Sequence, residues 1–252
     1  MDIKLLYLIS IFLFIFLCIT SVYIKRIFKG KYSSDIKISV LLYYDSDTIY
    51  LRSLLSTITK YKNINDIIVI YRGKQINFKH YKVRFFKDDL IKEYSSFIRF
   101  LYVPKCKNDT ILLLNNDIVP SERLILKLLY RYKNDMVNYY GIFQRSCNSS
   151  GYQTISLYNN IILSPVLLTS KEILERTWED MINDKERMLD ENMDDILFQF
   201  YFEKIYGKQP ILVRGKFKSF SSSLKNFYQY KVKNEYCKNL HKKNKYKEED
   251  FY

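Results

Sequence analysis

Residues 36–71 read IKISVLLYYDSDTIYLRSLLSTITKYKNINDIIVIY, and this stretch determines the predicted fold class. Its first nine residues, Ile36 to Tyr44, and its last six, Asp66 to Tyr71, are continuous apolar runs rich in β-branched residues. Such runs are typical of strands that are buried on both faces of a parallel sheet. Between them, from Thr48 to Tyr61, the apolar residues recur at helical spacing. The stretch therefore predicts a βαβ unit, whose crossover should be right-handed.

The same alternation of strands and helices continues along the chain. Strands are predicted at Tyr81 to Phe86 and at Thr110 to Leu114. Helices are predicted at Tyr94 to Tyr102, from Ser121 onward, from Thr169 to about Met181 with Glu172 completing a capping box, and at Asp194 to Tyr206, closed by Gly207. We therefore expect one α/β domain built on an open mixed sheet with helices on both faces.

A run of 20 residues without a charged side chain, Leu5 to Ile24, precedes this domain. At about 1.5 Å per residue a helix of this length crosses roughly 30 Å of hydrocarbon, so the run predicts a transmembrane signal anchor. A cleaved signal peptide is the alternative, but no small-x-small cleavage site follows the run. The basic residues after the run outnumber the single Lys4 before it, so the positive-inside rule would place the domain in the cytosol. The orientation is left open at this point.

The net charge of +14 is concentrated in two stretches. One is a collar of four basic residues between Lys25 and Lys31, and the other is a tail from Arg214 to Lys247 with eleven Lys and Arg residues against one glutamate. Such a tail could bind nucleic acid, anionic lipid or an acidic polysaccharide, or could simply be solvated. Because no nucleic-acid-binding motif is present, we expect no nucleic-acid partner. The predicted organisation is an anchor at 1–31, a domain at 32–237 and a charged tail at 238–252.

Three polar segments follow predicted strands: Asp45, Tyr71 to Gly73, and Asn115 to Asp117. In open α/β sheets ligands bind beyond the carboxyl ends of the strands, so we expect these segments to share one site. Oxygen-bearing side chains at such a position can hold Mn²⁺ or Mg²⁺ against a diphosphate. Asn115 and Asp117 are therefore candidate metal ligands, although an amide attracts a cation less than a carboxylate does. An ordinary polar turn is the alternative interpretation.

Five blocks of the sequence carry a family resemblance. The most specific is ENMDDILFQFYFEKIYGKQPILV at 191–213, followed by TILLLNNDIVPSERL at 110–124; the others are SVLLYYDSDTIYLRSLL at 39–55, DIIVIYRG at 66–73 and NIILSPVLLTSKEIL at 160–174. In their order along the chain they resemble the C-terminal glycosyltransferase domain of the exostosin and exostosin-like proteins, glycosyl transferase family 64. The block at 110–124 is similar to the family's metal-binding Asp-Asp-Asp segment, and the block at 191–213 is similar to its Asn-Cys-Asp-Asp helix.

The resemblance implies a nucleotide-diphospho-sugar transferase fold of the GT-A type. It implies an enzyme that moves N-acetylglucosamine or N-acetylgalactosamine from a UDP donor to a glycan or glycoprotein acceptor, with retention of configuration. It also implies a single-pass protein of the endoplasmic reticulum or Golgi with a lumenal domain. By the same resemblance Asn115 and Asp117 would hold the metal, Asp194 and Asp195 would serve the sugar, and the nucleotide would be lined by Tyr44, Asp45, Tyr71, Arg72, Arg99 and Asn116.

Several residues differ from the family pattern. Asn115 stands where the family has its first metal-site aspartate, and Ser95-Ser96 replace an Asn-Arg-rich helix start. Met193 replaces a cysteine that, in the family, is bonded to one retained here as Cys237, and Asn234 replaces an arginine. Each change removes a charge or a covalent bond. Two alternatives therefore stay open: a catalytically impaired relative that binds glycans or acts as a scaffold, and an inverting transferase with the same sheet.

Overall fold

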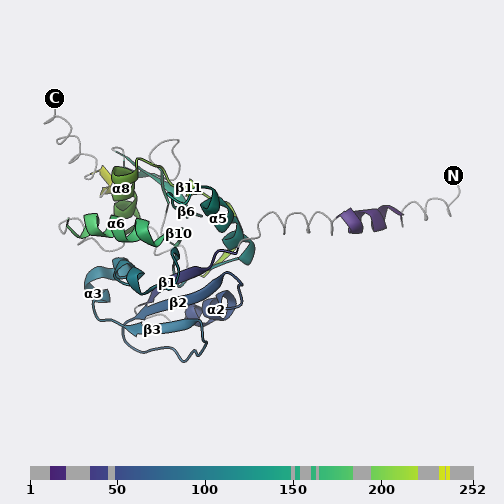
Figure 1. Cartoon of the computed structure of the whole chain (residues 1–252), viewed down its shortest axis with the longest axis horizontal. Coiled ribbons are helices and arrows are strands. Elements are labelled where there is room, and N and C mark those ends of the chain that lie inside the picture. Colours follow the sequence, from purple (N-terminus) through teal and green to yellow (C-terminus); the bar gives the residue numbers. More distant parts are fainter. Residues whose placement is uncertain are drawn as a thin grey trace. The chain divides into compact units, whose positions relative to one another are not determined.

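The computed structural model describes residues 12–20, 35–44, 49–148, 151–153, 160–162, 165–183, 194–220, 233–235 and 237–238. The chain divides into two compact units, Met1–Ser34 and Asp35–Tyr252. The second unit contains an α/β sheet with helices packed against it (Figure 1). Asp45, Met193 and most of the charged tail lie outside the described residues.

The described part of the N-terminal unit is helical from Phe12 to Thr20. Within the described residues no helix is both long and apolar enough to cross a membrane. For this part of the chain the predicted transmembrane helix is therefore wrong, and so is the single-pass location in the endoplasmic reticulum or Golgi that depends on it. The rest of Leu5–Ile24 and the basic collar lie outside the described residues.

Seven strands form one mixed sheet in the order β11-β6-β10-β4-β1-β2-β3. Its centre is parallel, because β1 (Ile38–Tyr44) pairs with β2 (Ile64–Tyr71) on one side and with β4 (Thr110–Leu114) on the other. β3 (Val83–Lys87) extends the parallel part beyond β2. Antiparallel β10 joins β4 to the far strands; these elements are β10 (Val166–Ser170), β6 (Tyr140–Gly141) and β11 (Ile211–Leu212).

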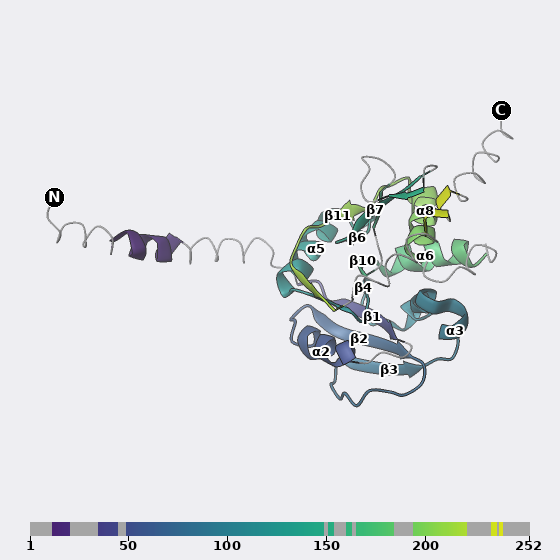
Figure 2. The ribbon, with the colours of Figure 1, turned by 180° about the vertical axis from the view of Figure 1, so that it is seen from behind.

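Helices cover both faces of this sheet. α2 (Ile49–Ile58) and α5 (Glu122–Asn134) pack on one face, where Leu42 and Leu112 point. α6 (Lys171–Ile182) and α8 (Asp194–Tyr206) lie side by side on the other face, where Leu41 and Leu113 point (Figures 1 and 2). Successive strand residues alternate between the two cores because side chains of a strand point to opposite faces. The mixed, largely parallel α/β sheet expected from the sequence is present, whereas the preceding transmembrane helix was the wrong part of the predicted fold class.

Two predicted helices differ in detail from those of the structure. α6 is capped by Ser170, whose hydroxyl accepts from the backbone N–H of Ile173 at 3.2 Å. Thr169, the expected cap, belongs to β10, and its hydroxyl donates to the carbonyl of Asn138 at 3.1 Å. The capping box with Glu172 is therefore wrong, because the hydroxyl of the buried threonine binds the loop between α5 and β6 instead of the helix start. The order of strand and helix is nevertheless as predicted.

The helix predicted over Tyr94 to Tyr102 is broken into three short pieces. These are α3 (Ile91–Tyr94), the 3-10 turn η1 (Ser95–Phe97) and α4 (Ile98–Leu101). The break occurs at Ser95, whose φ of 48° lies in a region that residues with a side chain rarely adopt. A second 3-10 turn, η2 (Val103–Lys105), follows. The break brings Ser96 and Arg99 into the interior, where both are buried.

Two small sheets complete the described structure. β5 (Ile118–Pro120) pairs antiparallel with β12 (Phe217–Ser219). β7 (Gln144–Asn148) pairs with β8 (Gly151–Gln153) and with β9 (Asn160–Ile162). None of these short strands was predicted, because each has only three to five residues and shows no recognisable periodic pattern.

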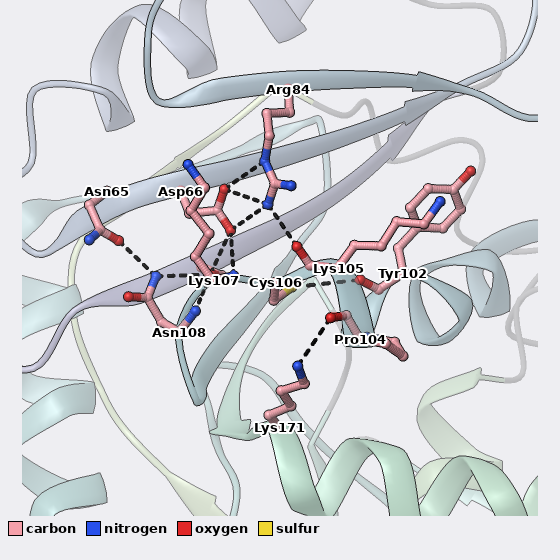
Figure 3. A network of polar contacts seen from close by, with 11 residues as sticks. Asn65, Asp66, Arg84, Tyr102, Pro104, Lys105, Cys106, Lys107, Asn108 and Lys171 are labelled. Atoms are coloured by element: carbon pink, nitrogen blue, oxygen red, sulfur yellow. Dashed lines mark hydrogen bonds and ion pairs between the residues drawn. The ribbon is translucent and has the colours of Figure 1, made fainter.

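A polar network joins the amino ends of the central strands (Figure 3). The buried carboxylate of Asp66 accepts from Arg84 at 2.7 Å, from the hydroxyl of Ser39 at 2.8 Å and from the backbone N–H of Lys107 at 3.0 Å. The side chain of Asn108 donates to Ser39 at 2.9 Å. Since each of these residues lies on a different strand or on the loop before β4, the network fixes the strand order at this edge of the sheet.

Candidate functional site

The turn Asn115–Asp117 lies at the opposite edge of the sheet, where β1, β2 and β4 end. The backbone N–H of Asn115 donates to the carbonyl of Pro165, just before β10, at 3.0 Å. On the other side of the turn, the N–H of Phe220, just after β12, donates to the carbonyl of Asp117 at 2.8 Å. The turn is therefore held by backbone hydrogen bonds from two different parts of the chain.

A buried arginine joins this turn to the start of α8. The side chain of Arg99 has no exposed surface, and it donates from Nη1 to Oδ1 of Asn115 at 3.2 Å and from Nη2 to Oδ2 of Asp194 at 2.5 Å. Its Nε donates to the carbonyl of Ser96 at 3.2 Å, and its guanidinium carbon lies 5.3 Å from the centre of the Tyr43 ring. Three predicted site residues, Arg99, Asn115 and Asp194, thus come together in the fold.

Tyr43 belongs to this cluster, although the sequence analysis did not select it. Burial raises the pKa of its phenol; the nearby Arg99 opposes this shift, whereas the carboxylates of Asp194 and Asp117 add to it. Tyr43 could have been found from the alternation of side chains along β1, which places neighbouring residues on opposite faces of the sheet. Tyr43 shares a face of β1 with Leu41, the face that packs against α4 and α8, whereas the selected residue Tyr44 points to the opposite core.

Asp195 has a separate cationic partner, Lys233. The ammonium group donates to both carboxylate oxygens of Asp195, at 2.8 and 2.7 Å, and the aspartate side chain is 3% exposed. Burial raises the pKa of the Asp195 carboxyl; Lys233 opposes this shift and the neighbouring Asp194 adds to it. Lys233 was overlooked because it lay within a tail whose many lysines could not be distinguished by composition.

Near Lys233, Cys237 is buried and disulfide-bonded, whereas Cys18 and Cys106 are free. The family's cysteine before the paired aspartates is absent here, and we inferred the loss of a covalent bond from Met193. Met193 cannot form that bond, but Cys237 is nevertheless disulfide-bonded in this structure. The segment that carries Lys233 is thus fixed to the domain by an ion pair and by a disulfide.

Asp117 is the residue that best fits a metal ion. Its Oδ1 is buried and has no hydrogen-bond partner in the described residues, so a cation or a ligand donor could satisfy it. Asn115 fits less well than predicted, because its amide oxygen already accepts from Arg99. No group of three His, Cys, Asp or Glu residues is arranged for a metal in the described ranges. A single carboxylate together with donor phosphates is a common arrangement for Mg²⁺.

The residues predicted to line the nucleotide lie along the same edge. The rings of Tyr44 and Tyr71 stack with centroids 5.8 Å apart, and the N–H of Arg72 donates to the carbonyl of Tyr44 at 3.3 Å. Both tyrosines are largely buried, and burial raises the pKa of Tyr44. Asn116 lies in the turn after β4, and Asp45 is outside the described residues. Tyr44 and Tyr71 thus pack in the core that faces α2 and α5, whereas Tyr43, which contacts Arg99, points to the opposite face of β1.

A cavity of about 570 Å³ lies elsewhere, near the start of β4 and the ends of α5 and α8. Its walls include Asp109, Tyr132, Glu172 and Tyr206, none of which was predicted as a site residue. It lies at the edge of the sheet opposite to Asn115–Asp117, since Asp109 precedes β4 and Asn115 follows it.

No protein-family model matches the chain, and no curated protein matches its sequence. Among solved structures, it is similar to 4-diphosphocytidyl-2C-methyl-D-erythritol synthase from Anaerococcus prevotii, with a TM-score of 0.54 and 12% identity over 78% of this chain and 96% of the synthase. The two chains share a fold. GalNAc-T7, solved with UDP, GalNAc and Mn²⁺, has a TM-score of 0.46 and 10% identity over 54% of this chain and 36% of its own, a likeness too low to establish a shared fold.

Proposed function

We propose that this protein is a glycosyltransferase that uses a nucleotide-sugar donor. The observation that carries the proposal is the cluster in which Arg99 joins Asn115 to Asp194 beside the unpartnered Oδ1 of Asp117. These residues come from separate segments and meet beyond the carboxyl ends of β1 and β4, where open α/β sheets bind their ligands. The fold shared with a synthase of a diphosphocytidyl compound supports the same class of ligand.

In the finer proposal, which rests on the resemblance to family 64, the donor is a UDP-N-acetylhexosamine and the transfer retains the anomeric configuration. Asp117 would hold Mn²⁺ or Mg²⁺ through Oδ1, and the ion would neutralise charge on the leaving diphosphate. Asp194 and Asp195 would orient the sugar and stabilise positive charge at its anomeric carbon. Tyr44, Tyr71, Arg72 and Asn116 would line the nucleotide, and a glycan or glycoprotein would be the acceptor.

The ion pairs of the site have a chemical consequence for this proposal. Arg99 holds Asp194 in one orientation, and Lys233 holds Asp195 by both oxygens. Both carboxylates are therefore preorganised rather than free to rotate when a donor binds, which is how fixed charges contribute to transition-state stabilisation. Their burial also keeps water away from the developing charge.

The test is binding of UDP to the full chain by calorimetry, with and without Mn²⁺. We expect binding that depends on Mn²⁺ and that weakens at least about tenfold in Asp117→Asn, because the metal would lose the carboxylate whose Oδ1 is unpartnered among the described residues. Asp109→Asn, at the far edge of the sheet, is the matched control and should bind within about twofold of wild type. Absence of UDP binding under both conditions would refute the proposal.

A second candidate is a catalytically impaired relative that binds glycans. It is favoured by the fact that both carboxylates of α8 are already ion-paired and that Asn115 replaces a charged ligand. Hydrolysis of UDP-N-acetylhexosamine by the wild type, abolished in Asp117→Asn, would exclude it. If transfer occurs, the configuration of the product distinguishes a retaining from an inverting enzyme.

A further inference from the structure

The guanidinium of Arg99 is buried among protein groups. Each of its three nitrogens donates to a protein acceptor: Nε to Ser96, Nη1 to Asn115 and Nη2 to Asp194. The side chain has no exposed surface, and the Tyr43 ring lies close to its guanidinium. An arginine that binds a phosphate presents an accessible pair of N–H groups. Arg99, expected from the family resemblance to contact the nucleotide, is therefore arranged for a different task.

We propose that Arg99 is a positioning residue that couples the Asn115–Asp117 turn to Asp194, and that the amide of Asn115 is its matched acceptor. The proposal rests on the proposed transferase function, because the coupling would serve to hold Asp194 and Asp117 in place around a donor sugar. The strained turn at Ser95 supports it, since an unfavourable φ of 48° directly precedes the segment that brings Arg99 inward.

An amide suits this position better than the carboxylate of the family pattern. Arg99 carries one positive charge, and the carboxylate of Asp194 already accepts from it. A carboxylate at 115 would add a second negative charge within reach of the same guanidinium, in a turn that also contains Asp117. Like charges at such short range raise the energy of the ionised state. The asparagine that looked like a lost ligand in the sequence is thus a neutral acceptor that leaves the pair with Asp194 undisturbed.

Arginine is also required by the geometry. A guanidinium is a planar fork that donates in two directions at once, whereas a lysine ammonium is a single point of charge. Arg99→Lys would keep the positive charge beside Asp194 but could not reach both acceptors in the same way. Asn115→Ala removes the other end of the coupling and leaves the ion pair with Asp194 in place.

The experiment measures steady-state hydrolysis of UDP-N-acetylglucosamine and UDP-N-acetylgalactosamine by the full chain. For Arg99→Lys, Asn115→Ala and Asn115→Asp we expect kcat to fall about tenfold or more, while the donor KM stays within about threefold, because misplaced groups slow the chemical step more than they weaken binding. The double variant R99K/N115A should be little slower than the worse single variant, since both remove one coupling. Arg84→Lys, in the other arginine–aspartate pair (Figure 3), is the control and should keep its kcat.

The outcomes are distinct. A rise in donor KM without a fall in kcat for R99K would mean that Arg99 contacts the phosphates, and would overturn the proposal. A faster N115D would show that the amide is a defect rather than a matched acceptor, and an independent, multiplicative effect in the double variant would show that no coupling exists. If R99K does not fold, N115A and N115D still decide. A wild type without turnover and without UDP binding refutes the proposed function itself, whereas an active wild type with unchanged variants refutes only the role of Arg99.

Discussion

Removing Arg99 should destabilise the domain strongly, and the size of the effect follows from burial. In Arg99→Met, the carboxylate of Asp194, whose side chain is 4% exposed, would lose its only cationic partner within the described part of the chain. Leaving one member of a buried ion pair uncompensated costs about 3 to 5 kcal/mol of unfolding free energy. With a urea m-value of about 3 kcal/mol/M for a domain of this size, the midpoint should fall by about 1 to 1.7 M.

The double variant R99M/D194L separates the charge effect from packing. Replacing both members of a buried pair with apolar side chains is often nearly neutral, so the midpoint should recover most of the loss. The control is Arg84→Met, because Asp66 keeps the hydroxyl of Ser39 and the N–H of Lys107 as donors. Its loss should be smaller, about 1 to 2 kcal/mol. Urea unfolding followed by far-ultraviolet circular dichroism gives all of these values; an R99M midpoint equal to that of the wild type would refute the reasoning.

Two further predictions concern other residues. Burial, assisted by Asp66, raises the pKa of the Cys106 thiol to about 12, so at pH 8 only about one molecule in 10⁴ should carry Cys106 as a thiolate. Alkylation of Cys106 should therefore be about a thousandfold slower than alkylation of the exposed Cys18. Mass spectrometry of the native chain treated with iodoacetamide should show Cys18 modified first, and equal rates would contradict this. A Cβ at Gly215 would lie 2.5 Å from Cδ1 of Leu124, so Gly215→Ala should lower stability by about 1 to 3 kcal/mol in urea unfolding, and an unchanged midpoint would disprove the expected clash.

The sequence allowed the order of the large elements to be predicted, because their patterns are long and local. The strand at Ile36 to Tyr44 and the helix at Asp194 to Tyr206 were each recognisable from the local sequence pattern, and the structure has both at nearly those positions. The predicted transmembrane helix was wrong for the described part, which includes Phe12 to Thr20 and contains no helix long and apolar enough to cross a membrane.

The candidate site was only partly predictable, because its contacts are not local. Family resemblance pointed to Asn115, Asp117 and the two aspartates of α8. It could not show that the N–H groups of Arg99 would bind Asn115 and Asp194 and so be unavailable to a ligand. Tyr43 was hidden beside a similar tyrosine, and Lys233 was hidden among many lysines. In each case the missing information was a distance across the fold between residues that the sequence places far apart.

The short ladder between β5 and β12 has a consequence for synthesis on the ribosome. The carbonyl of Asp117 is tied by Phe220, and Asp195 is held by Lys233, so both parts of the site depend on residues made about a hundred or about forty positions later. Domains begin to form while the chain is still emerging, at roughly 5 to 20 residues per second. The parallel sheet can therefore assemble first, and the candidate site is completed only several seconds later, when the segments that carry Phe220 and Lys233 have emerged.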